Sequence, residues 1–235
     1  MEIKILGSGS KGNSYWVSDG QSSVLLDAGL PFREIQRGID FKVADLDACL
    51  VTHEHGDHIK AVGDLIRLGV DCWMSWGTAK ALPDKTAMHR VKLVSHGEEF
   101  KAGTFTIMAF RTIHDSAEPL GFYLRSNHTG ETLLYATDTC YLPNRFDGLN
   151  YILLEVNYCQ ETLDENVKAG RIDPGLRNRI VQSHMSLQTA LGFFRANDLS
   201  KVKEITLIHL SDSNSQAEKI LREVQKASGK LVKIA

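Results

Sequence analysis

The sequence predicts an α/β fold in the form of a four-layer αββα sandwich. The first half is mostly short strands with a few helices, and the second half alternates helices with strands. Polar residues of the kind that carry chemistry stand at the ends of several apolar strands, which places them along one edge of a layered protein. No internal repeat or low-complexity linker is visible, so we expect one domain over residues 1–235.

Alternating hydrophobicity and turn signals predict the elements in order. Strands are expected at residues 2–6, 15–17, 23–27, 46–52, 70–75, 105–110, 120–124, 132–137, 151–156, 205–208 and 231–234, with short strands between residues 92 and 104. Helices are expected at residues 31–40, from 58 to about 66, and at 77–83, 161–180, 186–196 and 215–228. Ser186 is a favourable N-cap for the helix that it begins.

The composition is that of a globular protein with a substantial core, since 43% of the residues are hydrophobic and 24% are charged. The net charge of −2 means that any binding of nucleic acid depends on a local site. The four cysteines form no CxxC pair and are expected to be buried free thiols, which fits a reducing compartment. No signal peptide or long apolar run is visible, so we expect a cytoplasmic chain without a membrane contact.

The strongest chemical signal is the run Thr52-His53-Glu54-His55-Gly56-Asp57-His58, which directly follows an apolar strand. Neutral imidazole and carboxylate are ligands that borderline divalent metals prefer. Two metals need more ligands than this run supplies. His114, Asp138 and His209 each follow another apolar strand, so we expect them at the same edge of the fold.

Two further segments have two interpretations each. His184 stands just before a helix, where a histidine either caps the helix or donates a proton. The glycine-rich segment from Gly7 to Ser14 lacks the GxxxxGK[ST] pattern of a phosphate loop. We interpret it as a tight turn near the site, and contact between its backbone N–H groups and a phosphate stays open.

The run at residues 52–58 resembles the HxHxDH motif of the metallo-β-lactamase superfamily. Asp27 in Leu-Leu-Asp-Ala-Gly resembles the first motif of that superfamily, and His114, Asp138 and His209 resemble its third, fourth and fifth. Within the superfamily the sequence is most similar to the YycJ/WalJ-type exonuclease group. The matching stretches are residues 6–13, 27–29, 52–58, 136–139, 155–157, 184–186 and 209–211.

The resemblance implies a centre of two divalent metal ions per chain, zinc or manganese, with iron also suited to such ligands. By this resemblance the first metal is held by His53, His55 and His114, and the second by Asp57, His58 and His209. Asp138 bridges the two ions. Asp27 accepts the N–H of a ligand imidazole and thereby fixes the tautomer of that ring.

The resemblance also implies hydrolysis of phosphodiester bonds in nucleic acid, DNA or RNA, by a hydroxide shared between the ions. Asp57 would orient the hydroxide, and His184 would contact or protonate the phosphate. Candidates for contacts with the substrate are Ser211, Asn214, Arg171, Arg177 and Arg179. The other interpretation of the three arginines is a solvated helix face.

Two other functions stay open at this point. One is a small-molecule hydrolase with the same metal ligands, acting on cyclic phosphodiesters, thioesters or lactams. The other is a non-catalytic binding module that keeps metal for stability. The complete ligand set argues against the second, because a structural site needs only four ligands and no bridging carboxylate.

Overall fold

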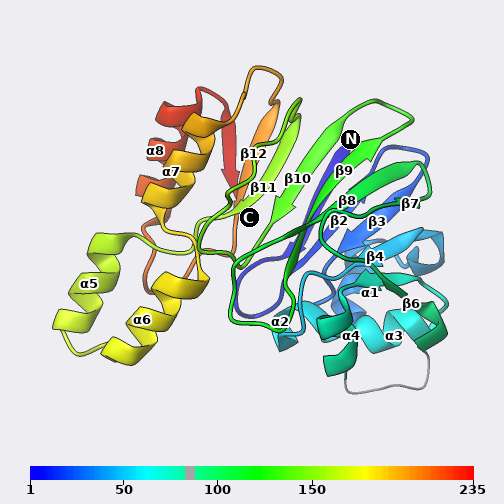
Figure 1. Cartoon of the computed structure of the whole chain (residues 1–235), viewed down its shortest axis with the longest axis horizontal. Coiled ribbons are helices and arrows are strands. Elements are labelled where there is room, and N and C mark those ends of the chain that lie inside the picture. Colours follow the sequence, from blue (N-terminus) through cyan, green and yellow to red (C-terminus); the bar gives the residue numbers. More distant parts are fainter. Residues whose placement is uncertain (83–87) are drawn as a thin grey trace. The chain divides into compact units, whose positions relative to one another are not determined.

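The computed structural model describes residues 1–82 and 88–235, which group into two compact units (Figure 1). Unit 1 comprises Met1–Arg111 and Ser116–Glu131, and unit 2 comprises Thr112–Asp115 and Thr132–Ala235. The expectation of one domain over residues 1–235 stays a prediction.

Unit 1 contains a six-stranded sheet in the order β1-β2-β3-β4-β5-β6. Its strands are β1 (Glu2–Gly7), β2 (Ser14–Ser18), β3 (Ser23–Leu26), β4 (Ala48–Leu50), β5 (Cys72–Met74) and β6 (Val91–Leu93). The first three strands pair antiparallel, and β3 to β6 pair parallel. Because β3 and β4 are parallel neighbours, their carboxyl ends bring Asp27 and the run from Thr52 to the same edge of the sheet.

Helices cover one face of this sheet through a hydrophobic core. The helices of unit 1 are α1 (Phe32–Gly38), α2 (Gly56–Ile59), α3 (Val62–Arg67) and α4 (Trp76–Ala81), with 3-10 turns η1 (Val43–Asp45) and η2 (Met88–Arg90). Cys49 and Cys72 point from neighbouring strands into a core shared with Ile35 of α1 and Leu65 of α3, all fully buried. Burial of each large aliphatic side chain contributes roughly 1.5–3 kcal/mol.

Three further strands complete unit 1. They are β7 (Glu99–Ala102), β8 (Phe105–Arg111) and β9 (Leu120–Ser126), and they pair antiparallel. Trp73 of β5 stacks on Phe100 of β7, with ring centroids 3.9 Å apart and an interplanar angle of 14°. Since side chains alternate along a strand, Trp73 points away from Cys72, so β7 lies on the sheet face opposite the helices.

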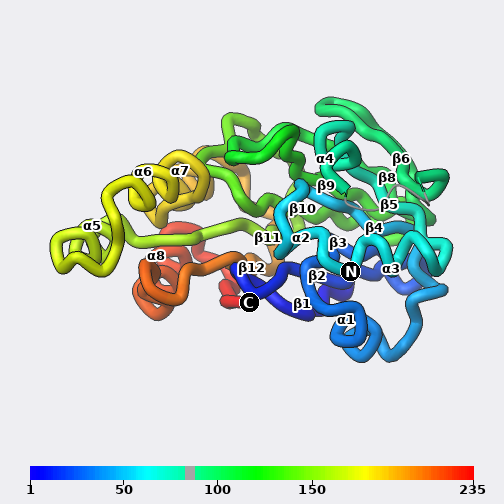
Figure 2. The backbone as a smooth tube through the Cα atoms, turned by 90° about the horizontal axis from the view of Figure 1, so that it is seen from below, coloured from blue at the N-terminus to red at the C-terminus, as the bar shows by residue number. Residues whose placement is uncertain are grey.

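Unit 2 contains a parallel sheet in the order β13-β12-β11-β10. Its elements are β10 (Thr132–Ala136), β11 (Tyr151–Glu155), α5 (Gln160–Lys168), α6 (Pro174–Ser183), α7 (Leu187–Ala196), β12 (Glu204–Ile208), α8 (Ala217–Ser228) and β13 (Leu231–Ile234). α7 packs on α8, which packs on β13, and α5 and α6 lie side by side beyond them (Figures 1 and 2).

Most predicted elements are confirmed, including α7 with its predicted cap, since the Ser186 side chain accepts a hydrogen bond from the backbone N–H of Thr189. The helix expected at residues 77–83 is α4, and Pro83 lies outside the described residues.

The expected helix from residue 58 to about 66 is wrong in its start and continuity. It begins at Gly56 and is broken between α2 and α3. The backbone explains the break: the carbonyl of His58 accepts from the N–H of Ala28 at 2.9 Å, and the N–H of Ala61 donates to the carbonyl of Ala28 at 2.8 Å. Both groups are therefore used by the segment after β3 rather than by a continuous helix.

The single helix expected at residues 161–180 is also wrong, because the structure has two helices, α5 and α6. Gly170 has a φ of +68°, which turns the chain after α5. Pro174 then begins α6, where its missing N–H costs nothing, and Asp173 caps the helix by accepting from the N–H of Gly175. Charged and polar residues recur at helical spacing both before Gly170 and after Pro174, so the sequence predicted one helix instead of two.

Asp19 is a buried carboxylate in the turn between β2 and β3, and it joins three segments of unit 1. Its Oδ2 accepts from the hydroxyls of Ser126 and Thr104, each at 2.5 Å, and its Oδ1 accepts from the N–H groups of Gln21 and Ser22. Burial by itself raises the pKa of Asp19, but these hydrogen bonds outweigh burial and lower the pKa to about 2.

We predict that Asp19→Asn lowers the free energy of unfolding by about 1–3 kcal/mol near neutral pH. The folded pKa of about 2 lies below that of an unfolded aspartate, so the stabilisation is complete above the unfolded pKa and is lost as the pH falls towards the folded one. Urea unfolding of both proteins as a function of pH should therefore give curves that converge in acid. A difference in stability that is independent of pH would contradict the assignment.

Candidate metal centre

Three of the predicted site residues stand just beyond the carboxyl ends of strands. Asp27 follows β3, Asp138 closely follows β10 and His209 follows β12. Each adopts a left-handed conformation, with φ of +55°, +46° and +54° respectively. This conformation costs a non-glycine residue about 1–3 kcal/mol, and such strain concentrates at functional sites. The turn directs each side chain away from the strand axis at the sheet edge.

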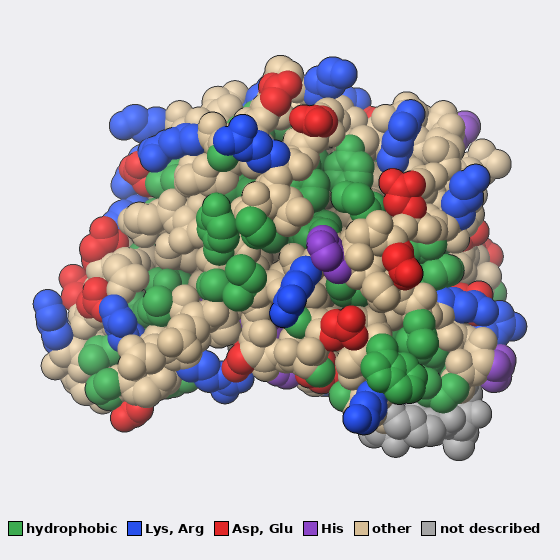
Figure 3. All heavy atoms as spheres, viewed as in Figure 1, with side chains coloured by type: hydrophobic (Ala, Val, Ile, Leu, Met, Phe, Trp, Pro, Cys, Tyr) green, Lys and Arg blue, Asp and Glu red, His purple; other side chains and the backbone are tan. Residues whose placement is uncertain are grey.

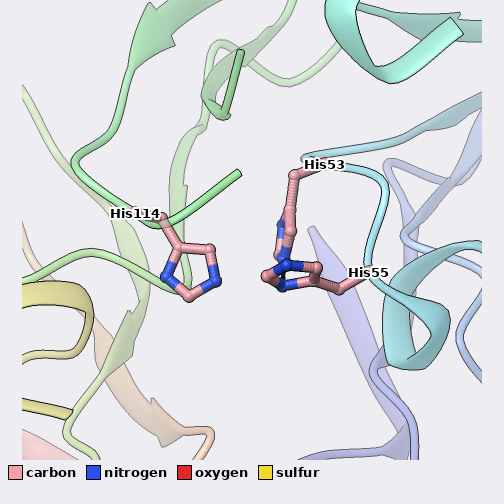
Figure 4. Close-up of side chains that lie close together, drawn as sticks. All are labelled: His53, His55 and His114. Atoms are coloured by element: carbon pink, nitrogen blue, oxygen red, sulfur yellow. Dashed lines mark hydrogen bonds between the residues drawn. The ribbon is translucent and has the colours of Figure 1, made fainter. Parts of the chain in front are cut away.

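The ligand loop of unit 1 follows β4 and runs into α2, and it carries His53 and His55 before α2 and Asp57 and His58 within it. His53 Nε2 lies 3.0 Å from His55 Nδ1, and the two rings meet edge to face (Figure 4). The rings of His53 and His58 have centroids 4.1 Å apart. His53 and His58 are buried and Asp57 is partly exposed, so the loop gathers three imidazoles and one carboxylate on a single side.

Asp27 holds both ends of this loop through its carboxylate. Its carboxylate is fully buried and accepts from the N–H of Thr52 at 2.8 Å and from the hydroxyl of the same residue. Its Oδ2 also lies 2.8 Å from His58 Nδ1. A carboxylate in this place holds the Nδ1–H tautomer of His58, so that Nε2, which lies 3.4 Å from Asp57 Oδ2, is the nitrogen suited to binding a metal ion.

The glycine-rich segment between β1 and β2 holds the loop from the other side, which confirms its interpretation as a turn near the site. Asn13 donates its backbone N–H to the carbonyl of Asp57 at 2.8 Å, and its side-chain Nδ2 lies 3.2 Å from His58 Nε2 and 3.3 Å from Asp57 Oδ2. Sequence reasoning missed Asn13. A lone asparagine in a glycine-rich turn is so often a turn former that only the folded contacts distinguish it.

Unit 2 contributes a second cluster, formed by His114, Asp138, His184, His209 and Glu155. Asp138 Oδ1 lies 3.7 Å from His114 Nε2, 3.5 Å from His184 Nδ1 and 3.7 Å from His209 Nε2. These separations are longer than hydrogen bonds. Three imidazole nitrogens therefore surround one oxygen of the Asp138 carboxylate, and its other oxygen accepts from the hydroxyl of Thr137 at 2.9 Å.

Partners outside the cluster set the orientation of its histidines. His114 Nδ1 lies 2.8 Å from the carbonyl oxygen of Ser183, so this nitrogen is the donor and Nε2 faces Asp138 (Figure 4 shows the His114 ring). Nδ1 of His209 lies 3.2 Å from Nδ2 of Asn157 and 3.3 Å from Oε1 of Glu155. Such outer contacts fix which nitrogen of each ring is presented as a ligand.

Glu155 is the second residue that the sequence analysis did not place in the site. It is fully buried at the end of β11, and its Oε2 accepts from the N–H groups of Thr139 and Met185 at 2.9 and 3.1 Å. Its Oε1 lies 2.6 Å from His184 Nδ1. Its position at the end of an apolar strand, like those of Asp138 and His209, was the signal that could have found it.

The charges of Glu155 and His184 support each other. Burial opposes a charge on either group, yet the adjacent imidazole holds the pKa of Glu155 below its usual value, and the adjacent carboxylates raise the pKa of His184. Burial lowers the pKa of His114, which favours the neutral imidazole that a metal ligand requires.

Ser186, not His184, caps α7, so the capping interpretation of His184 is wrong.

The donor set fits a divalent metal ion. Asp138, Glu155, His184 and His209 each place one ligand atom within 4.8 Å of the others. Imidazole nitrogen and carboxylate oxygen are the ligands of zinc, manganese and iron sites in proteins. The clustered His and Asp side chains are therefore suited to binding metal ions.

The residues predicted to contact the substrate have partners within unit 2. Arg177 pairs with Asp164 at 3.0 Å, and Arg179 pairs with Asp115 at 2.5 Å. The remaining three residues also make hydrogen bonds within the unit, namely Arg171 to Asn166, and Ser211 and Asn214 to each other. Their contact with a substrate stays a prediction.

A model of the β-lactamase superfamily domain matches residues 22–210. The chain belongs to the β-lactamase superfamily. It is 31% identical to the exodeoxyribonuclease WalJ of Streptococcus pneumoniae over 232 residues, which cover 92% of this chain and 84% of that protein. It is 29% identical to the exodeoxyribonuclease YycJ of Bacillus anthracis, with 93% and 85% covered. The family and the names of these relatives support an enzyme of the hydrolase type.

Solved structures agree on the fold. The metallo-β-lactamase fold protein YhfI from Bacillus subtilis superimposes with a TM-score of 0.71 at 18% identity, over 99% of this chain and 95% of that one. The metallo-β-lactamase fold predicted from the sequence is therefore confirmed. Within residues 1–82 and 88–235, no helix is both long enough and apolar enough to cross a membrane.

We predict that Gly29→Ala displaces the ligand loop. A Cβ at Gly29 would lie 1.6 Å from the carbonyl oxygen of Asp57 and 2.7 Å from the backbone N of Asn13, so backbone must move. The melting temperature should fall by several degrees, as overpacking costs about 1–3 kcal/mol or more, and the metal content by elemental analysis should fall with it.

Gly63→Ala is the matched control, because a Cβ there meets only the flexible end of Arg67 at 3.6 Å, and alanine favours the helix. This control should keep the stability and metal content of the parent. If Gly29→Ala behaved like Gly63→Ala, the ligand loop would not depend on the close approach.

Proposed function

We propose that the chain is a metal-dependent phosphodiesterase that acts as an exonuclease on DNA. The observation that carries the proposal is the ring of three imidazole nitrogens around Asp138 Oδ1 in unit 2. Two exodeoxyribonucleases that align with more than nine-tenths of the chain support the choice of DNA. A structural metal site does not need so many titratable donors around one carboxylate.

The proposed ligands are those that the sequence indicated. His53, His55 and His114 would hold one ion, Asp57, His58 and His209 would hold the other, and Asp138 would serve both. When bound, two divalent ions activate water near neutral pH and offset the charge that develops on a phosphoryl group.

The chain's own residues supply orientation and protons. Asp57 is the partly exposed carboxylate of the ligand loop, held by Asn13, and would orient the attacking water. His184 would act as the proton donor to the phosphate or the leaving oxygen. Glu155 binds His184 Nδ1, so the Nε2 of that ring is the nitrogen left to face the substrate. General acid catalysis of this kind contributes roughly 10²–10⁴-fold in rate.

Asp138→Ala is expected to abolish hydrolysis and to lower the metal content together, because one carboxylate serves both ions in the proposal. The assay offers single-stranded and duplex DNA, RNA and a small bis-phosphodiester side by side, with manganese or zinc added. Stepwise shortening of DNA from one end by the unmodified protein supports the exonuclease. Full activity in Asp138→Ala would exclude the two-metal proposal.

Cleavage of the small diester alone, with every polynucleotide untouched, would move the function to a small-molecule phosphodiesterase. Asn144→Ala is a matched control for Asp138→Ala, since it removes a polar side chain of similar size from the loop that follows β10. This control should keep both metal and hydrolysis of the small diester.

His184→Ala should lower kcat for DNA by about 10²–10⁴-fold while leaving metal bound, because a proton donor is lost and the proposed ligands stay. Elemental analysis and single-turnover rates of the same preparation test this. Loss of metal in parallel with activity would reassign His184 as a ligand.

A further inference from the structure

A pocket of about 410 Å³ lies in unit 2 between α7 and the loop that precedes β11. We refer to it as the α7 pocket. Its volume falls within the ~300–1,000 Å³ typical of small-molecule sites. The residues that matter for its chemistry are Tyr141, Arg145, Thr189, Gly192, Phe193 and Ala196.

One wall of the pocket is a single face of α7. Thr189, Gly192, Phe193 and Ala196 recur at the three- and four-residue spacing of a helix face, so they line the pocket together. Gly192 leaves this wall open, because a Cβ there meets no atom within 4 Å. Figure 3 shows hydrophobic side chains gathered beside α7 on the face in view.

Each wall of the pocket follows a residue of the unit 2 cluster in the sequence. Tyr141 comes three residues after Asp138, which limits their backbone separation to ~11 Å. The carbonyl of Tyr141 accepts from the hydroxyl of Thr139 at 2.8 Å, which ties the loop to the turn that carries Asp138. α7 begins three residues after His184. The two segments that line the pocket are therefore joined through short stretches of backbone to residues of the unit 2 cluster.

The pocket combines an aromatic ring with a cation. Tyr141 is 54% exposed and lines the pocket, so its ring is accessible for stacking on a planar ligand. Arg145 is exposed and forms no ion pair with any residue in the described ranges 1–82 and 88–235. An aromatic ring can stack on a base, and a guanidinium can pair with a phosphate. Together they can bind a nucleotide.

We propose that the α7 pocket binds one nucleotide of a single-stranded DNA substrate, with its base stacked on Tyr141 and its phosphate paired with Arg145. This inference rests on the proposed exonuclease function and adds a place where the substrate strand is held. Arginine suits this task better than lysine, because its planar fork matches phosphate oxygens. Stacking on tyrosine tolerates any base, which fits digestion without sequence preference.

The test measures binding of a short, phosphorothioate-linked, single-stranded oligonucleotide by fluorescence anisotropy, so that hydrolysis does not intervene. Tyr141→Ala should raise Kd about tenfold, the usual effect of losing one stacked base. Arg145→Ala should raise Kd several-fold and lower the slope of log Kd against log salt by about 0.7, the value for one phosphate contact on a single strand. Gly192→Leu should also weaken binding by filling the pocket.

Arg195→Ala is the matched control, because Arg195 is an exposed arginine on the same helix that does not line the pocket. It should change Kd less than twofold. A series of oligonucleotides with one abasic position each adds a second readout. At one position, removal of the base should weaken binding to the parent protein but not to Tyr141→Ala.

The outcomes separate the two proposals. If the parent protein binds and degrades DNA while the three pocket variants bind like Arg195→Ala, the α7 pocket is not a nucleotide site and the exonuclease stands. If the parent protein neither binds nor degrades DNA but hydrolyses the small diester, both proposals fail together. If only Arg145→Ala weakens binding and no abasic position changes Kd, the pocket binds a phosphate alone. That result would overturn the proposed stacking of a base on Tyr141.

Discussion

The buried carboxylate of Asp27 is the interaction on which unit 1 depends. Removing a charge from water costs several kcal/mol unless hydrogen bonds replace the lost solvent. Thr52 and His58 provide that replacement, and in doing so they fix the two ends of the ligand loop. The backbone of the ligand loop at Asp57 comes so close to the segment after β3 that a Cβ at Gly29 would clash with it. Ala28, in the same segment, forms backbone hydrogen bonds with His58 and Ala61, and these separate α2 from α3. The Asp27 carboxylate thus holds the ligand loop, and the backbone hydrogen bonds of the neighbouring Ala28 account for the helix break.

Glu155 has the corresponding place in unit 2. It too is fully buried at a strand end, and it accepts from two backbone N–H groups while contacting two imidazoles. Neither carboxylate is exposed to solvent, so neither is placed to meet a substrate. Each instead orients histidines whose other nitrogen faces outward. The units use the same physical arrangement on unrelated strands, one antiparallel in part and one wholly parallel.

The sequence could predict the strands, the fold and most of the histidines, because hydrophobic periodicity and dense ligand motifs are local signals. It failed at 161–180, where the charged pattern continued across Gly170 and Pro174 and hid two helices. It also missed Asn13 and Glu155. The role of Asn13 is created by a contact with Asp57, 44 positions away, which no local pattern records, whereas the strand-end position of Glu155 was a local signal that could have found it. The α7 pocket likewise needs a loop and a helix brought together by folding.

Strain and buried charge are concentrated at the same strand ends. Three left-handed residues each cost about 1–3 kcal/mol, and imidazole nitrogens of His114 and His209 lie 3.7 Å from the buried carboxylate of Asp138. A fold that is stable by only about 5–15 kcal/mol carries such costs only where other interactions offset them. Metal ions that bind the folded chain stabilise it by mass action, since the unfolded chain lacks the assembled ligands. The clusters that would perform the chemistry therefore couple the stability of the fold to occupancy of the site.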